Sequence, residues 1–205
     1  MKHPGLIRSH ATGLTQARHG AGGGVFRGGG GFVREQAAPG AAAAVDPEQN
    51  RMKRDVFVEL SPAGAVKVSL NESAIGRSAA RNRALYNRLS EPDYRKLIER
   101  WISGGAPAAT VETLEVVDRG NAGFDLTVTF SAPSYGQSIA GRLLVFKPAI
   151  VSRRNGINLT DTDDREHPVL LGARALDETI RIALPEGYVI DERPSDVTLH
   201  TDFGD

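Results

Sequence analysis

The stretch Phe124-Asp125-Leu126-Thr127-Val128-Thr129-Phe130 decides the fold class of this chain. Its apolar residues occupy alternate positions, and Asp or Thr stands at each position between them. Successive side chains of an extended chain point to opposite faces, so the four apolar residues share one face. The stretch is therefore predicted to be a β-strand with one face in a core and the other toward water.

Alternating apolar residues mark two more strands nearer the N-terminus. The segment between them has proline and glycine at positions that suit a tight turn. Together the two runs predict a β-hairpin that begins near Arg54. The first run is Val56, Val58 and Leu60, the second is Val66, Val68 and Leu70, and the turn is Ser61-Pro62-Ala63-Gly64.

A pair of helices is predicted between this hairpin and the later strands. The first covers 77–89, which is rich in Ala, Arg and Leu. The second is capped by Ser90, has Pro92 in its first turn and ends at Gly104-Gly105. Its apolar residues recur at helical spacing and predict one buried stripe, which favours core packing over ligand stacking for Trp101. They are Tyr94, Leu97, Ile98, Trp101 and Ile102.

The remainder of the chain consists of short apolar runs separated by turns. The fold class predicted from them is mainly β, an antiparallel β-sandwich with the helical pair packed on it. A turn-rich link at 118–123 joins the run 111–116 to the strand that starts at Phe124, which predicts a second hairpin. Further strands are predicted at 139–147, 169–171, 179–183, 188–190 and 197–201, with a turn at 184–187.

Three regions are predicted along the chain. Residues 1–50 form a disordered Gly/Ala-rich leader, 51–106 hold the hairpin and the helical pair, and 107–205 form the β-sandwich, packed as one unit with 51–106. The leader has eight glycines within 20–31 and cannot bury enough apolar surface to order itself. A transit peptide and a phosphate loop are weaker interpretations. Neither a strand before the glycines nor Gly-Lys-Ser/Thr after them is present.

Composition excludes several classes of function. The formal net charge is zero, which argues against a nucleic-acid binder. The chain has no cysteine, so disulfides, thiolate metal sites and cysteine nucleophiles are excluded. The apolar run Leu143-Leu144-Val145-Phe146 is far shorter than the roughly 18 residues of a membrane span. Arg8 and His10 interrupt the region where a signal peptide would be apolar.

The polar segment 151–166 and the histidine after it contain the one cluster of candidate metal ligands. Oxygen ligands at alternate positions suit calcium, and an Asp/His mixture suits a transition metal. Arg153, Arg154 and Arg165 offer counter-charges, so a solvated loop with ion pairs is the preferred interpretation. Accordingly we predict no metal site, no cofactor and no catalytic residue. The cluster is Asp161, Asp163, Asp164, Glu166 and His167.

Four motifs, taken in order, resemble a known family. They are Phe130-Ser131-Ala132-Pro133-Ser134-Tyr135, Gly141, Arg165-Glu166-His167-Pro168-Val169 and Leu184-Pro185-Glu186-Gly187-Tyr188. The chain from 54 to 205 resembles the β-rich C-terminal domain of unknown function that follows the transglutaminase-like core in large bacterial proteins. The core itself is missing here, and its cysteine nucleophile has no counterpart in this chain.

The resemblance implies a non-catalytic accessory domain, detached from or lacking its catalytic core. Its implied partner is a transglutaminase-like catalytic domain or a cell-envelope component, and the implied location is the periplasm or cell envelope. A free-standing module that binds a cell-envelope polymer or protein is the alternative, and an exposed aromatic row on a concave sheet would favour it. An enzyme that uses carboxylates would be indicated by a buried, hydrogen-bonded acid pair in a cleft.

Overall fold

The structure, a computed structural model, describes residues 6–11, 46–151 and 172–200. Strand β5 (Phe124–Ala132) contains the stretch that decides the fold class, and its side chains alternate between buried and half-buried along its whole length. Phe124, Leu126, Val128 and Phe130 are each at most 1% exposed. The predicted strand, with the predicted face in the core, is confirmed.

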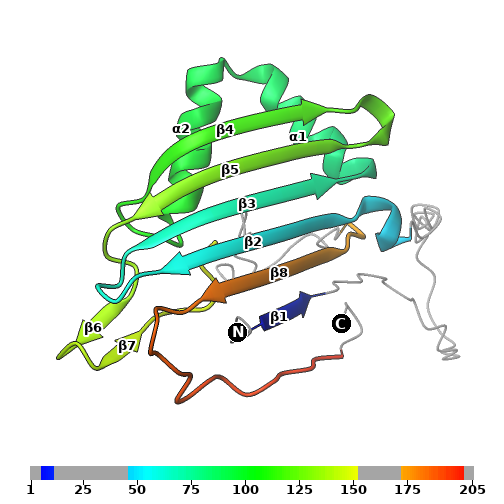
Figure 1. The fold of residues 1–205 in the computed structure, drawn as a ribbon. Coiled ribbons are helices and arrows are strands. Elements are labelled where there is room, and N and C mark those ends of the chain that lie inside the picture. The colour runs from blue at the N-terminus through cyan, green and yellow to red at the C-terminus, as the bar shows by residue number, and fades with distance from the viewer. Residues whose placement is uncertain (1–5, 12–45, 152–171, 201–205) are drawn as a thin grey trace, which may run out of the picture.

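Among the described residues, six strands form one sheet in the order β1-β8-β2-β3-β5-β4 (Figure 1). Neighbouring strands run antiparallel, except that β2 and β8 run parallel. The mainly β class is confirmed, but the sheet is mixed, not antiparallel as predicted. The strands beside β5 are β1 (Leu6–Ala11), β2 (Met52–Leu60), β3 (Val66–Ala74), β4 (Thr110–Asp118) and β8 (Leu176–Ala183).

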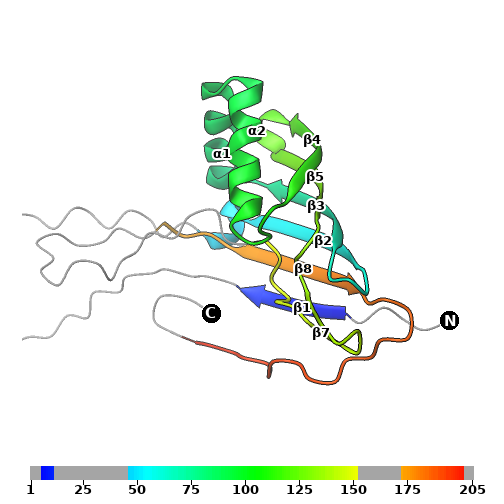
Figure 2. The same ribbon diagram turned by 90° about the vertical axis from the view of Figure 1, so that its left-hand side faces the viewer.

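The described residues do not build the two facing sheets of a sandwich. The only other sheet among them is a short hairpin of β6 (Gln137–Ile139) and β7 (Leu143–Val145). Two helices lie over one face of the large sheet, and no described element covers its other face (Figure 2). The apolar stripe of the second helix supplies the surface that a second sheet would otherwise provide.

Both predicted helices are present, within a residue or two of the predicted ends. Helix α1 spans Gly76–Arg88 and helix α2 spans Glu91–Ser103. The hydroxyl of Ser90 accepts a hydrogen bond from the Asp93 amide and caps α2, as its sequence predicts. Most of the predicted stripe is buried, and Leu97 is half-buried against the same core.

The hairpin of β2 and β3 is also confirmed, with Leu60 opposite Val66 beside the turn. The Gly64 amide donates to the Ser61 carbonyl at 3.0 Å, and Gly64 has a φ of +86° that favours glycine. The Gly136 amide donates to the Gly64 carbonyl at 2.8 Å. The turn therefore also anchors the chain just before β6.

Three predictions for the C-terminal half need correction. The strand expected over 139–147 is broken by Ala140 and Gly141, both at positive φ, and becomes the β6–β7 hairpin. Residues 188–190 and 197–200 are not strands, although Tyr188-Val189-Ile190 is an apolar run and Val197 and Leu199 alternate with polar residues. Val189 and Val197 are largely exposed there, because the sheet offers them no neighbouring strand. The run 169–171 lies outside the described residues.

The disordered leader needs a partial correction. Leu6–Ala11 forms β1, which pairs with β8 along its whole length. Pro47–Asn50 forms a short 3-10 helix, η1, because the Asp46 side chain accepts a hydrogen bond from the Glu48 amide and caps it. The other leader residues lie outside the described part of the chain.

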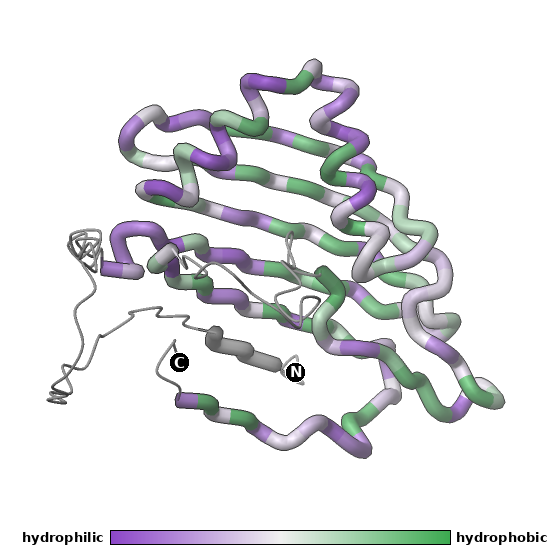
Figure 3. Tube along the Cα trace, turned by 180° about the vertical axis from the view of Figure 1, so that it is seen from behind, coloured by the Kyte–Doolittle hydropathy of each residue, from purple (hydrophilic) through white to green (hydrophobic). Residues whose placement is uncertain are grey.

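The core lies between the sheet and the helices. Figure 3 shows hydrophobic and hydrophilic residues alternating along the strands, as a sheet with one covered face requires. One cluster joins inward residues of β2, β3, β4, β5 and β8 to α2, and so draws on both the 51–106 and the 107–205 ranges. Tyr86 adds an edge-to-face contact with Tyr94, with ring centroids 4.9 Å apart.

Candidate functional site

The candidate residues named from the sequence fall largely outside the described part of the chain. This applies to the acidic cluster from Asp161 to His167 and to the three neighbouring arginines. Within 46–151 and 172–200, no three His, Asp or Glu side chains gather as metal ligands. No helix in the described ranges is long and apolar enough to cross a membrane. Trp101 is 8% exposed and packs in the core, so its predicted structural role is confirmed.

An ionic cluster on the covered face of the sheet is the main charged feature that the sequence reasoning missed. It consists of Arg54 on β2, Glu72 on β3 and Glu178 on β8, and is called the ionic triad below. Arg54 stands directly opposite both glutamates in the strand register. The sequence does carry a signal for it, because Arg54 and Glu72 occupy inward positions of the apolar alternation that predicts the hairpin.

The guanidinium of Arg54 joins the two carboxylates. Its Nε and Nη2 donate to Glu72 Oε2 at 3.0 and 2.7 Å, and its Nη1 donates to Glu178 Oε1 at 2.7 Å. Arg54 and Glu72 are each 2% exposed. The Trp101 ring covers the guanidinium, with 5.0 Å between Cζ and the ring centroid, within cation–π range. Strands and helix are thus connected through one buried cation.

Electrostatics keep that cation charged. Burial by itself lowers the pKa of Arg54, because a low-dielectric interior disfavours a charge. The charge of Glu72 and the hydrogen bonds to both glutamates outweigh burial and raise the pKa of Arg54 above its ordinary value. A permanent cation between two carboxylates is an arrangement that holds strands together.

The triad therefore meets only part of the condition set for an enzyme. Two hydrogen-bonded acids are present, but only Glu72 is buried, Glu178 is half-buried, and an arginine separates them. The pocket between α1 and α2 is lined by Trp101 and by none of the three triad residues. In the described residues the triad connects strands β2, β3 and β8 to one another and, through Trp101, to helix α2.

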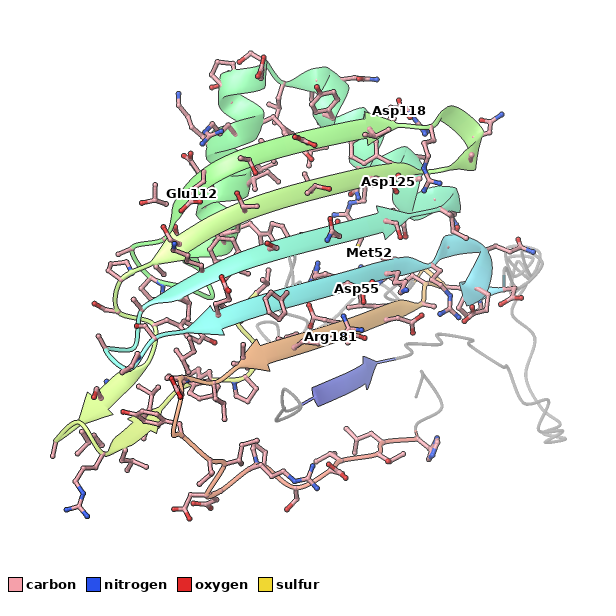
Figure 4. The ribbon with its side chains drawn as sticks, in the orientation of Figure 1. Met52, Asp55, Glu112, Asp118, Asp125 and Arg181 are labelled. Atoms are coloured by element: carbon pink, nitrogen blue, oxygen red, sulfur yellow. The ribbon has the colours of Figure 1, made fainter. Side chains whose placement is uncertain are left out.

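The face of the sheet that no described element covers is called the open face below. Asp55, Asp125 and Arg181 lie along it (Figure 4). Between these charges stand hydroxyl and amide side chains in register across neighbouring strands. The Thr127 hydroxyl donates to Asn71 Oδ1 at 3.1 Å, and a 2.7 Å hydrogen bond joins the Thr113 and Thr129 hydroxyls.

One exposed aromatic residue interrupts this polar surface. Phe57 on β2 is 41% exposed and stands opposite Ser69 on β3 and Arg181 on β8. Aromatic residues and arginine are residue types enriched in protein interfaces. Phe57 is the one aromatic side chain of the open face among the described strands, so the aromatic row that would favour a polymer-binding module is not found there.

The structure also contains a pocket of about 430 Å³ between the two helices. Arg81 and Arg88, seven residues apart on α1, contribute to its lining, and Ile98 and Trp101 on α2 contribute apolar surface. Sequence reasoning assigned the apolar stripe of α2 to the core and did not foresee a pocket beside it. The spacing of the two arginines is the one signal that pointed to a cationic face on α1.

Comparison of this chain with models of protein families, with curated proteins and with solved structures finds no match. The resemblance to the domain that follows transglutaminase-like cores thus rests on the sequence motifs alone. The fold and the geometry of the described residues carry the functional argument.

Proposed function

We propose that the chain is a non-catalytic accessory domain that docks a protein partner on its open face. The observation that carries the proposal is the open face itself, a broad sheet surface that no described element covers. The partner we propose is a transglutaminase-like catalytic domain, on the strength of the sequence motifs. Without a cysteine, this chain supplies no thiolate for such chemistry, which needs an activated nucleophile.

The open face has the size that protein docking requires. Strands β8, β2, β3, β5 and β4 lie side by side at a spacing of about 4.8 Å, which gives a width of roughly 24 Å. Strands of eight or nine residues extend for about 30 Å. The resulting area of roughly 700 Å² is close to the ~800 Å² that each partner buries in a standard protein–protein interface.

The chemistry of the open face favours a protein over a polysaccharide. Polymers of sugars are held by several stacked aromatic rings, and this face offers Phe57 alone among its described residues. A single aromatic with an adjacent arginine, surrounded by hydroxyl and amide groups, instead matches the central anchor and polar rim of a protein interface. Phe57 and Arg181 are therefore the residues proposed to contribute most to the binding energy.

The experiment measures binding of the purified chain to the transglutaminase-like catalytic domain encoded nearest to it, by isothermal titration calorimetry. The double variant Phe57→Ser/Arg181→Ser is expected to weaken binding at least about tenfold, because both anchors are lost. Ile139→Ser/Arg142→Ser is the matched control, since it removes the same kinds of exposed side chain from the β6–β7 hairpin. Its affinity should stay within about twofold of the unchanged chain.

Two results would reject the proposal. One is no binding at a chain concentration of about 100 μM, and the other is equal loss of affinity in both double variants. A third arm tests the non-catalytic part, by amine incorporation into a glutamine substrate with the purified chain alone. Turnover that persists through further purification and disappears on a point change in the described residues would show that the chain is an enzyme.

A further inference from the structure

The pocket between α1 and α2 has a lining that is chemically divided. Leu85 of α1 and Ile98 and Trp101 of α2 supply apolar surface. Arg81 and Arg88 of α1 supply positive charge, and no acidic side chain lines the pocket among the described residues. A ligand that matches this lining has an apolar body and one negatively charged end.

Asn82 adds a buried polar group to the same pocket. It lines the pocket, is 7% exposed, and its side-chain nitrogen has no hydrogen-bond partner among the described residues. A buried amide donor without a partner destabilises a folded protein, and an acceptor on a bound ligand would satisfy this donor. Rotation about the bond that carries the amide lets either its nitrogen or its oxygen turn toward the pocket.

Arg88 provides the charge that an anionic acceptor needs. It is exposed in the last turn of α1 and makes no hydrogen bond or ion pair with another described residue. A guanidinium binds a carboxylate through two parallel N–H donors, which fixes orientation as well as charge. Arg88 and Asn82 lie six residues apart on one helix, and both line the pocket.

From these observations we infer that the pocket between α1 and α2 binds a small monocarboxylic acid with an apolar body. The carboxylate lies against Arg88 and Asn82, and the apolar body lies on Ile98 and Trp101. A volume of about 430 Å³ falls in the range of pockets that hold small molecules, and a chain of about eight carbons fits within it. This inference is independent of the open face and of the proposed partner.

The test uses Trp101, the single tryptophan of the chain, as a reporter within the pocket wall. The full chain is titrated with octanoate while tryptophan fluorescence is followed, and calorimetry on the same samples measures the affinity independently. Octanamide and octylamine have the same apolar body with a neutral or a positive end. Octanoate is expected to bind with saturation, and at least about tenfold more tightly than either.

Two pairs of exposed α-helical variants locate the site. Arg88→Gln should weaken octanoate binding about three- to tenfold, while Arg100→Gln, in the last turn of α2 and outside the lining, should leave it unchanged. Ala84→Phe, which fills the pocket from its rim, should abolish binding. Ala80→Phe, one turn earlier on α1 and outside the lining, should not.

The inference is overturned by any of three outcomes. The first is that calorimetry detects no saturable octanoate binding up to about 10 mM. The second is that octanoate binds no more tightly than octanamide. The third is that each test variant behaves like its control. Circular dichroism on every variant shows whether it is folded. Because Arg88 and Arg100 are both exposed, Arg88→Gln and Arg100→Gln are expected to fold and can be compared directly.

Discussion

Replacement of Arg54 by methionine is the most informative single perturbation of this fold. Methionine retains much of the apolar volume of arginine but removes the cation between Glu72 and Glu178. The three charge-assisted hydrogen bonds are lost, and the carboxylates on either side of position 54 are left without their cation. Removing one partner of a buried ion pair costs about 3–5 kcal/mol, because the remaining charge stays buried without compensation.

The lower half of that range is expected, since the Glu178 side chain is 17% exposed and retains some hydration. A loss of about 3 kcal/mol would consume a large part of the 5–15 kcal/mol by which an ordinary domain is stable. The assay is urea unfolding at pH 7, followed by circular dichroism. Arg181→Met is the matched control, because Arg181 is exposed on the open face, and it should change the free energy of unfolding by less than about 0.5 kcal/mol.

A triple variant separates the loss of charge balance from the loss of packing. Arg54→Met combined with Glu72→Leu and Glu178→Leu should recover most of the stability, since apolar residues often replace buried ion pairs without penalty. A loss below about 1 kcal/mol for Arg54→Met, or a triple variant no more stable than the single one, would refute this account of the triad.

Three further predictions concern packing, the turn and pH. Trp101→Ala should lower the free energy of unfolding by about 3–5 kcal/mol in denaturant titrations, and a loss below roughly 1 kcal/mol would show that its ring is not packed. Gly64→Ala should lower the free energy of unfolding by at least about 2 kcal/mol, because the new Cβ would lie 1.9 Å from the Gly136 carbonyl oxygen. Gly141→Ala, at φ +64° with open space around it, should lower it by only about 1 kcal/mol. Equal losses in the two variants would contradict the predicted clash with Gly136. Burial raises the pKa of Tyr135 to about 12. The folded state therefore keeps a proton that the unfolded state releases near pH 10. The free energy of unfolding should fall as the pH rises from about 10 to 12. Tyr135→Phe should reduce this loss of stability between about pH 10 and 12, as measured by thermal melts. An unchanged pH dependence would show that Tyr135 is not its cause.

The sequence predicts the elements whose partners are close along the chain. The β2–β3 and β4–β5 hairpins and the pair α1–α2 follow from local alternation, turn residues and the Ser90 cap, all of which act within a few residues. Strand β8 was recognised as a strand, but its parallel pairing with β2 depends on contacts between residues more than a hundred positions apart. No local pattern distinguishes that pairing from the antiparallel one.

The difference between local patterns and long-range strand pairing also explains which strands were predicted wrongly. Val197 and Leu199 alternate with polar residues as strand residues do. A strand forms only where a neighbouring strand accepts its hydrogen bonds, and the described sheet offers none there. Conversely, Leu6–Ala11 lies in a glycine-rich leader but finds a partner in β8. For the candidate site, Arg54 and Glu72 break the inward apolar pattern visibly. That these two residues form an ionic triad with Glu178 can be seen only from the strand order, which places β8 beside β2.

The open face is the central claim, and a single introduced thiol tests it most directly. The chain has no cysteine of its own, so Ser69→Cys on the open face creates the one reactive thiol. Ala80→Cys, exposed on α1 on the covered side of the sheet, is its counterpart. The measurement is the rate of maleimide labelling of each variant, alone and with the transglutaminase-like catalytic domain at saturating concentration.

Both thiols are expected to react at the rate of an exposed cysteine in the free chain. With the catalytic domain bound, labelling at position 69 should slow at least about tenfold, while labelling at position 80 stays unchanged. Slow labelling at position 69 in the free chain would show that the face is already covered. Equal labelling of position 69 with and without the bound catalytic domain would show that the partner docks elsewhere.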